Sequence, residues 1–292
     1  MKKFLRTALV GGCAMLMVAC GNDAEKENKK PDMPTYETKE KFRLGNWGVP
    51  PHENSGYMEY SNNPNYCTTE HWQNMKDCGF NLAIPTGGFD IPEIRRDLAM
   101  AEEVGMDLLV RDRTTNGFET IINFCKTNGY DYRHTMEELN KKAEDIKANI
   151  EIFKQYKSFI GITAYDEPSM DYYPIIAACQ DWFYKYYPEY EFYTNLLPVY
   201  ATPKQLCGDL NGKGYNYEDY VREFAEDVNP SVLSYDHYPI LTDYDESLYI
   251  KEDFMYNLNV FAQQAKKSRV GVNIYLQVMG FYSNAPITQY EE

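Results

Sequence analysis

The stretch FIGITAYDEPSMDYY, residues 159–173, joins an apolar run to two adjacent carboxylates and a proline. Its first part, residues 159–165, has the length and the β-branched and aromatic content of a buried strand. Asp166, Glu167 and Pro168 follow directly. Ligand sites of α/β proteins lie at the carboxyl ends of parallel strands. The stretch therefore predicts a buried strand that ends in a polar site.

Six other apolar runs of the same kind flank this one, with longer amphipathic segments between them. We expect strands at residues 44–49, 80–85, 107–111, 159–165, 191–196, 232–238 and 270–278. We expect helices at residues 69–78, 90–104, 135–156, 173–186, 217–228 and 251–267. Strands that alternate strictly with helices indicate a parallel sheet covered by helices.

Unusual polar or aromatic residues stand at or just after the ends of six predicted strands: Trp47, Arg111 with Asp112, Asp166 with Glu167, Asn195, Asp236 with His237, and Gln277. An open doubly wound sheet would concentrate such residues at one switch point, whereas a barrel collects them from many strands. We therefore predict an α/β fold of the (β/α)8 TIM barrel type. Only seven strands can be counted, so we expect residues 42–292 to form a barrel that is truncated before the eighth strand.

The first 41 residues read as a targeting segment. Lys2, Lys3 and Arg6 precede an apolar stretch at residues 7–19, which is too short to span a bilayer core that needs about 20 residues. The sequence LMVACG, residues 16–21, resembles a bacterial lipobox with Cys20 as the lipidated residue. We expect a signal peptide at 1–19, a flexible tether at 20–41, and a lipid-anchored protein of the cell envelope, at the periplasmic or outer-membrane surface. The alternative is an ordinary signal peptide that releases a soluble periplasmic protein.

The charge balance restricts the possible partners. The formal net charge is −15, and a cleaved signal would remove three further positive charges. Such a surface repels nucleic acid and anionic lipid, so we expect no nucleic acid partner and membrane contact only through the lipid anchor. A neutral carbohydrate suits both this charge and the 27 tyrosines and 14 phenylalanines, although most of these rings will serve core packing.

No cofactor or metal is expected. The motifs GxGxxG and GxxxxGK do not follow a predicted strand, and GxSxG and HExxH are absent. The cysteines Cys67, Cys78, Cys125, Cys179 and Cys207 form no CxxC pair and no His–Cys spacing suited to zinc. We interpret them mainly as small buried residues, with a disulfide such as Cys67–Cys78 permitted in the periplasm.

The Asp166-Glu167-Pro168 motif resembles that of TIM-barrel glycoside hydrolases with an Asn-Glu-Pro or Asp-Glu-Pro at the end of strand four. Shorter similarities lie in GNWGVPP (45–51), SYDHYPI (234–240) and IYLQVMGFY (274–282). Together they look most like the glycosidase-like lipoproteins of gut Bacteroides. The resemblance implies that Glu167 is the general acid/base on a carbohydrate substrate. The other interpretation is that the motif only opens a helix.

A glycosidase needs a second carboxylate, and here the sequence departs from the family. The resemblance places a nucleophilic glutamate at the end of strand seven, where this chain has Gln277. Asp236 is the best remaining candidate and Asp112 the second. A separation of about 5–5.5 Å from Glu167 would predict retention, and roughly 6.5–9.5 Å inversion. Asp166 would keep Glu167 protonated or bind sugar hydroxyls.

The remaining candidates would bind substrate. Trp47 would stack on a sugar ring, Arg111 and Asn195 would bond hydroxyls or hold the acid in place, and His237 and Tyr238 would flank Asp236. The predicted function is hydrolysis of a neutral glycan. The alternatives are a non-catalytic surface glycan-binding protein, a degenerate hydrolase, or a non-functional fragment that cannot complete its barrel.

Overall fold

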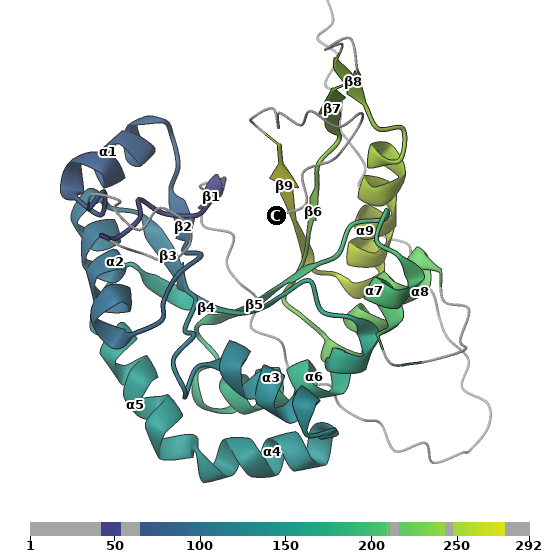
Figure 1. Ribbon diagram of the computed structural model, residues 1–292, viewed down its shortest axis with the longest axis horizontal. Helices are drawn as coiled ribbons and strands as arrows, with labels where there is room; N and C mark the ends of the chain where they lie inside the picture. Colours follow the sequence, from purple (N-terminus) through teal and green to yellow (C-terminus); the bar gives the residue numbers. More distant parts are fainter. Residues whose placement is uncertain (1–41, 54–64, 209, 211–215, 243–247, 278–292) are drawn as a thin grey trace, which may run out of the picture. The chain divides into compact units, whose positions relative to one another are not determined.

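The computed structural model describes residues 42–53, 65–208, 210, 216–242 and 248–277 (Figure 1). By internal contacts the chain divides into two units, Met1–Met33 and Pro34–Glu292, and all described residues belong to the second. The predicted signal peptide, the lipidation site Cys20 and the predicted tether at 20–41 lie outside the described residues. The end of the strand predicted at 270–278 also falls partly outside them.

Seven parallel strands form the main sheet in the order β1-β2-β3-β4-β5-β6-β9. They are β1 (Gly45–Trp47), β2 (Leu82–Ile84), β3 (Asp107–Val110), β4 (Phe159–Asp166), β5 (Glu191–Leu196), β6 (Val232–His237) and β9 (Gly271–Leu276). These are the seven predicted strands, in the predicted places and with parallel pairing throughout. The alternation of strand and helix is thus confirmed as a parallel α/β sheet.

The sheet is curled into a half-barrel. Its first and last strands do not pair with each other, yet the rings of Trp47 on β1 and Tyr275 on β9 meet edge to face, with centroids 5.3 Å apart. The concave face holds Leu82, Ile84, Leu109 and Tyr193, and packed against them lie Trp47, Ile160, Val232 and Tyr275. This inner cluster corresponds to the side-chain layers that fill a (β/α)8 barrel. The fold class is therefore that of a barrel with seven described strands.

Helices cover the outer face of the sheet, where the larger hydrophobic core lies. They are α1 (Thr69–Asp77), α2 (Ile91–Val104), α3 (Phe118–Thr127), α4 (Tyr132–Lys141), α5 (Ala143–Phe153), α6 (Tyr173–Tyr186), α7 (Pro203–Cys207), α8 (Tyr217–Glu223) and α9 (Phe254–Ser268), with a short 3-10 helix at Met170–Tyr172. Asp90 accepts a hydrogen bond from the Glu93 amide and so caps α2, and Gly105 ends that helix at φ 69°. No described helix combines the length and the apolar composition needed to cross a membrane.

Several local predictions were wrong. The helix expected at 135–156 is two helices, because α4 packs against α6 while α5 packs against α2, and the chain turns at Lys142 between them. The helix expected at 217–228, by contrast, is confirmed over those bounds as α8 followed by a π-helical segment, η2 (Phe224–Val228). The sequence analysis also missed α3, α7 and the antiparallel hairpin of β7 (Ile240–Thr242) and β8 (Leu248–Ile250). Short-range periodicity does not register these long-range packing choices.

The five cysteines of the barrel domain are free thiols. Cys67, Cys125, Cys179 and Cys207 are buried, as expected for small apolar residues, and Cys78 is exposed. The structure contains no Cys67–Cys78 disulfide.

Candidate active site

One amide side chain links two carboxylates at the ends of three adjacent strands. The Nδ2 group of Asn195 on β5 donates to Asp236 Oδ1 on β6 at 2.9 Å and lies 3.4 Å from Asp166 Oδ1 on β4. Ser234 Oγ donates to Asn195 Oδ1 at 3.0 Å, which fixes the orientation of the amide. The structure therefore brings together three residues that the sequence analysis named: Asp166, Asn195 and Asp236.

A β-bulge in β4 turns Asp166 toward this cluster. Thr163 pairs with Tyr193 and Tyr165 with Thr194, so Ala164 is an extra residue. Ala164 packs in the helix-side core, and the Tyr165 hydroxyl donates to Asn123 Oδ1 on α3 at 2.8 Å. Strict alternation after Thr163 would have turned Asp166 toward the helices. The bulge restores its inward orientation, a known use of bulges next to sites.

Glu167 adopts a backbone conformation that is rare for a residue with a side chain. Its φ is 51°, in the left-handed region, and its N–H donates to the Asn195 carbonyl at 2.9 Å. Its side chain is exposed and lies close enough to Asp236 to lower the pKa of that carboxyl group. A hydrogen bond between two carboxyl groups requires one of them to be protonated. Glu167 can therefore donate to Asp236 only in its protonated form.

The buried carboxyl groups of the cluster have raised pKa values. Burial raises the pKa of Asp166 to about 6; the Arg111 charge opposes the shift and the Asp236 charge adds to it. Burial also raises the pKa of Asp236, against the hydrogen bonds from Asn195, Tyr238 and Glu167. Desolvation disfavours the charged form of a carboxyl group, and a second negative charge nearby acts in the same direction.

Arg111 and Trp47 border the cluster on the side of β1 and β3. Arg111 Nη1 lies 4.0 Å from Asp166 Oδ2, and its Nε donates to Glu119 Oε2 on α3 at 2.7 Å. The guanidinium lies 5.6 Å from the centroid of the Trp47 ring, whose edge contact with Tyr275 was described above. Both residues thus lie beside the carboxylates, although Arg111 is chiefly paired with Glu119.

Asp112 and His237 come one position after the inward-facing residues Arg111 and Asp236. Their side chains therefore point away from the cluster and bond to other residues. Asp112 accepts hydrogen bonds from the Thr114 amide at 2.9 Å and from Asn149 Nδ2 on α5 at 3.0 Å. His237 is fully buried, and its Nε2 lies 3.1 Å from Asp253 Oδ1. Burial lowers the pKa of His237, against the attraction of Asp253. The structure therefore does not show either side chain in contact with Glu167.

Gln277 and Tyr238 differ in their relation to the site. Tyr238 makes a hydrogen bond with Asp236 and so belongs to the cluster. Gln277 pairs with the backbone of Ile240: its Oε1 accepts from the N–H at 2.9 Å and its Nε2 donates to the carbonyl at 3.1 Å. An amide can accept and donate in this way without taking up a proton, whereas an ionised glutamate could only accept.

Tyr220 is a positioning residue that the sequence analysis missed. Its side chain is fully buried, its hydroxyl donates to the Pro168 carbonyl at 2.8 Å, and it accepts from the Leu197 amide at 3.1 Å. It thereby joins the turn after β4, which carries Glu167, to the turn after β5. No local signal marks this role, because Tyr220 lies on α8, about fifty residues away in sequence.

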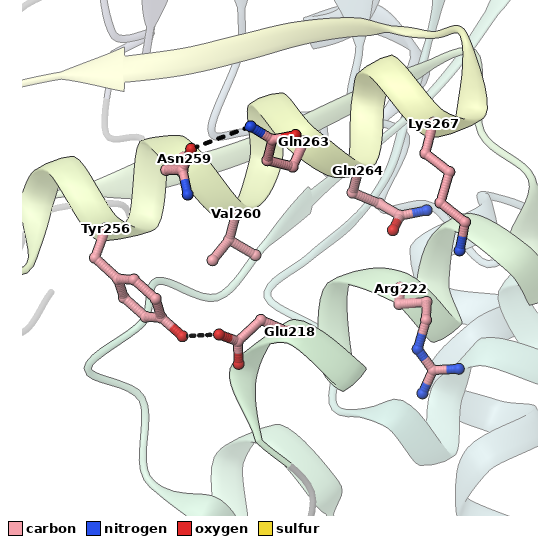
Figure 2. Close-up of a pocket in the computed structure, with 8 residues that line it drawn as sticks. All are labelled: Glu218, Arg222, Tyr256, Asn259, Val260, Gln263, Gln264 and Lys267. Atoms are coloured by element: carbon pink, nitrogen blue, oxygen red, sulfur yellow. Dashed lines mark hydrogen bonds between the residues drawn. The ribbon is translucent and has the colours of Figure 1, made fainter.

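A surface cavity lies elsewhere, on the outer layer between α8 and α9 (Figure 2). Its volume is about 420 Å³, and the Tyr256 hydroxyl bonds to Glu218 at one end. It is lined by Glu218, Arg222, Tyr256, Asn259, Val260, Gln263, Gln264 and Lys267, none of which belongs to the strand-end cluster.

No protein-family model matches the sequence, and no match is found among curated proteins. The chain is similar to a crystal structure described as a "putative alpha-L-fucosidase" from Bacteroides thetaiotaomicron, at 14% identity and a TM-score of 0.47, over 80% of this chain and 74% of that one. It is also similar to homocysteine methyltransferase MmuM from Escherichia coli, at 10% identity and a TM-score of 0.29, over 70% of this chain and 77% of that one. Since both TM-scores are below 0.5, we draw no functional conclusion from either likeness.

Proposed function

We propose that the protein is a glycoside hydrolase that acts on a neutral glycan, with Glu167 as general acid/base and Asp236 as the second carboxylate. One observation carries this proposal: Asn195 holds Asp236 and Asp166 together at the carboxyl ends of β4, β5 and β6, and Glu167 follows Asp166 directly in the chain. Cleavage of a glycosidic bond requires one carboxyl group as acid and a second as base or nucleophile, and this cluster supplies both.

The difference in burial between Glu167 and Asp236 suits their proposed roles as general acid/base and second carboxylate. Glu167 is exposed and can reach a leaving-group oxygen, whereas Asp236 is only 7% exposed and is held by Asn195. The stereochemical course depends on the distance between the two carboxyl groups around a bound sugar, roughly 5–5.5 Å for retention and roughly 6.5–9.5 Å for inversion.

The surroundings favour an uncharged sugar. Three acidic side chains, Asp166, Glu167 and Asp236, gather here, and the nearby Arg111 is paired with Glu119. An anionic sugar would meet repulsion that a neutral one does not. The Trp47 ring, held between Arg111 and Tyr275, supplies an aromatic face for stacking.

The test is a panel of neutral polysaccharides and aryl glycosides with wild-type protein, Glu167→Gln and Asp236→Asn. We expect each variant to lose at least about 10³-fold in kcat/KM while keeping its cooperative unfolding transition. Asp112→Asn is the matched control, because Asn can still accept from the Thr114 amide, and it should retain activity. Undiminished turnover by Glu167→Gln would refute the mechanism.

Rescue by azide tests the role of Asp236 separately from that of Glu167. If Asp236 is a nucleophile, azide should restore turnover to Asp236→Ala and give a glycosyl azide of inverted configuration. A general base of an inverting reaction would give the same inverted azide, so the configuration of the wild-type hydrolysis product, retained for a nucleophile and inverted for a base, separates these two roles. Full activity of Asp236→Ala without azide would remove Asp236 from the mechanism.

A second candidate function is glycan binding without catalysis. Gln277 favours it, because this amide, paired with the Ile240 backbone, stands where the resemblance places a nucleophile. Calorimetric binding of an oligosaccharide with no product from any member of the panel would support this function. In that case Trp47→Ala should abolish binding and Glu167→Gln should leave it unchanged.

For the cellular location we propose anchoring to the cell envelope by lipidation of Cys20. The supporting observation is the LMVACG sequence at residues 16–21. Replacement of Cys20 by serine should move the protein from the membrane fraction to the soluble fraction. Membrane association that persists in Cys20→Ser would contradict the proposal.

A further inference from the structure

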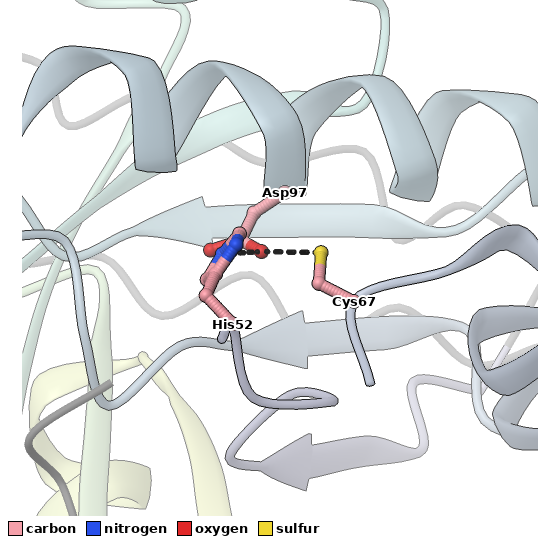
Figure 3. Close-up of side chains that lie close together, drawn as sticks. All are labelled: His52, Cys67 and Asp97. Carbon is pink, nitrogen blue, oxygen red and sulfur yellow. Dashed lines mark hydrogen bonds and ion pairs between the residues drawn. The ribbon is translucent and has the colours of Figure 1, made fainter. Parts of the chain in front are cut away.

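A second group of chemically reactive side chains lies between the loop after β1 and helix α2. His52, Cys67 and Asp97, here called the His52 cluster, converge so that one ligand atom from each lies within 4.8 Å of the others (Figure 3). His52 Nε2 is 2.8 Å from Asp97 Oδ1, and Cys67 Sγ is 3.5 Å from the same oxygen. The exposed fractions are 7%, 4% and 2%. The cluster therefore combines an imidazole, a thiol and a carboxylate away from water.

The local backbone holds these side chains together. The Tyr66 amide donates to the Pro51 carbonyl at 3.0 Å, which aligns the segment of His52 with that of Cys67. The Cys67 amide donates to Asn65 Oδ1 at 3.0 Å, which fixes the turn before α1. Asp97 comes from the buried side of α2. Since three separate segments supply the three groups, the convergence is set by the tertiary structure.

We propose that the His52 cluster binds one Zn²⁺ ion, with His52 Nε2, Cys67 Sγ and an Asp97 carboxylate oxygen as protein ligands. Tetrahedral zinc with bond lengths of about 2.0–2.3 Å spaces its ligand atoms roughly 3.3–3.6 Å apart. The Cys67–Asp97 distance of 3.5 Å already agrees, and the His52–Asp97 pair must open by roughly half an ångström. The fourth tetrahedral position is left for a water molecule or another donor.

Charge and ligand type both favour this ion. A thiolate and a carboxylate supply two negative charges and a neutral imidazole none, so a bound Zn²⁺ leaves the buried cluster without net charge. A mixed sulfur, nitrogen and oxygen set suits zinc, whereas Mg²⁺ and Ca²⁺ select oxygen ligands alone. The ion would tie the loop after β1 and the start of α1 to α2, a structural role separate from the carboxylates at the strand ends.

The sequence analysis expected no metal because it looked for close cysteine and histidine pairs. Along the chain, Asp97 lies 45 residues after His52 and 30 residues after Cys67, which leaves 15 residues between His52 and Cys67. Such spacing matches no short zinc motif, so only the folded structure reveals the group.

The test measures metal content in the full-length protein purified from zinc-supplemented medium. We expect about one zinc per chain in the wild type and a loss of at least tenfold in His52→Ala and Cys67→Ser. Cys78→Ser and His134→Ala remove an exposed cysteine and an exposed histidine and should keep the full zinc content. Less than a tenth of an ion per wild-type chain after zinc supplementation would overturn the proposal.

Cobalt distinguishes a lost ligand from a variant that fails to fold. Wild-type protein stripped with a chelator and titrated with Co²⁺ should show a thiolate-to-cobalt charge-transfer band together with the visible bands of tetrahedral cobalt. Cys67→Ser should lose the charge-transfer band, and Cys78→Ser should keep it. A wild type without this band, whose melting temperature responds to neither chelator nor Zn²⁺, would show that the His52 cluster is only a hydrogen-bonded ion pair.

Discussion

The concave face of the sheet changes character between its middle and the carboxyl ends of its strands. In the middle, Leu82, Ile84 and Leu109 are buried together in a hydrophobic cluster. At the strand ends, Asp166 and Asp236 lie close together with raised pKa values, and Glu167 has a left-handed backbone. Close hydrophobic packing in the middle of the concave face stabilises the fold. The buried carboxyl groups and the left-handed backbone at the strand ends reduce its stability. Stability sacrificed by strained backbone and buried carboxyl groups is typical of a functional site.

The largest expected effect is a loss of folding stability when the hydrophobic middle of the concave face is changed. Leu109 is fully buried on the concave face, and Leu109→Ala should destabilise the fold by about 2–5 kcal/mol through lost burial and the cavity left behind. Urea denaturation at 25 °C measures the change. Glu167→Gln provides the contrast, with an expected change within about 0.5 kcal/mol. A Leu109→Ala loss below about 1 kcal/mol would mean that the concave face is not closely packed.

Tyr220 connects the two regions and should show an effect on both stability and activity. Tyr220→Phe leaves the Pro168 carbonyl and the Leu197 amide without their buried partner, which costs about 1–3 kcal/mol. Because the turn that carries Glu167 is then less fixed, kcat should fall while KM changes little. The control is Tyr173→Phe, which removes a hydrogen bond to the Tyr220 carbonyl and should leave kcat unchanged. Equal kcat values for both variants would rule out positioning.

Asp166 should reduce stability at neutral pH. Its folded pKa of about 6 lies above its ordinary value of 3.8, so the stability that its proton contributes is complete below about pH 4 and is lost as the pH rises through 6. Asp166→Asn should therefore stabilise the protein at pH 8 by about 1–2 kcal/mol, a value reduced because the side chain is 29% exposed. Near pH 4 the two proteins should be equally stable. A gain of the same size at both pH values would exclude titration of Asp166 as its cause.

The sequence predicted the strands well because each strand of a covered parallel sheet is a continuous apolar run. It also predicted which polar residues end the strands. Period-two alternation could have indicated that Asp112 and His237 face away from their inward-facing neighbours, and this signal was not used. The bulge at Ala164 could not be predicted, because it is defined only by pairing with β5. Nor could the role of Tyr220 or the convergence of the His52 cluster, since both depend on contacts between distant segments.

The smallest expected effect concerns the Glu167 backbone. A φ of 51° costs a residue with a β-carbon about 1–2 kcal/mol, whereas glycine adopts it freely but loses roughly 0.5–1 kcal/mol of chain entropy on folding. Glu167→Gly should therefore be more stable than wild type by about 0.5 kcal/mol, and Glu167→Ala, which keeps the β-carbon, should not gain. Both variants should be inactive. Paired urea titrations of the two variants resolve this difference, and an alanine variant as stable as the glycine variant would show that the backbone at Glu167 is not strained.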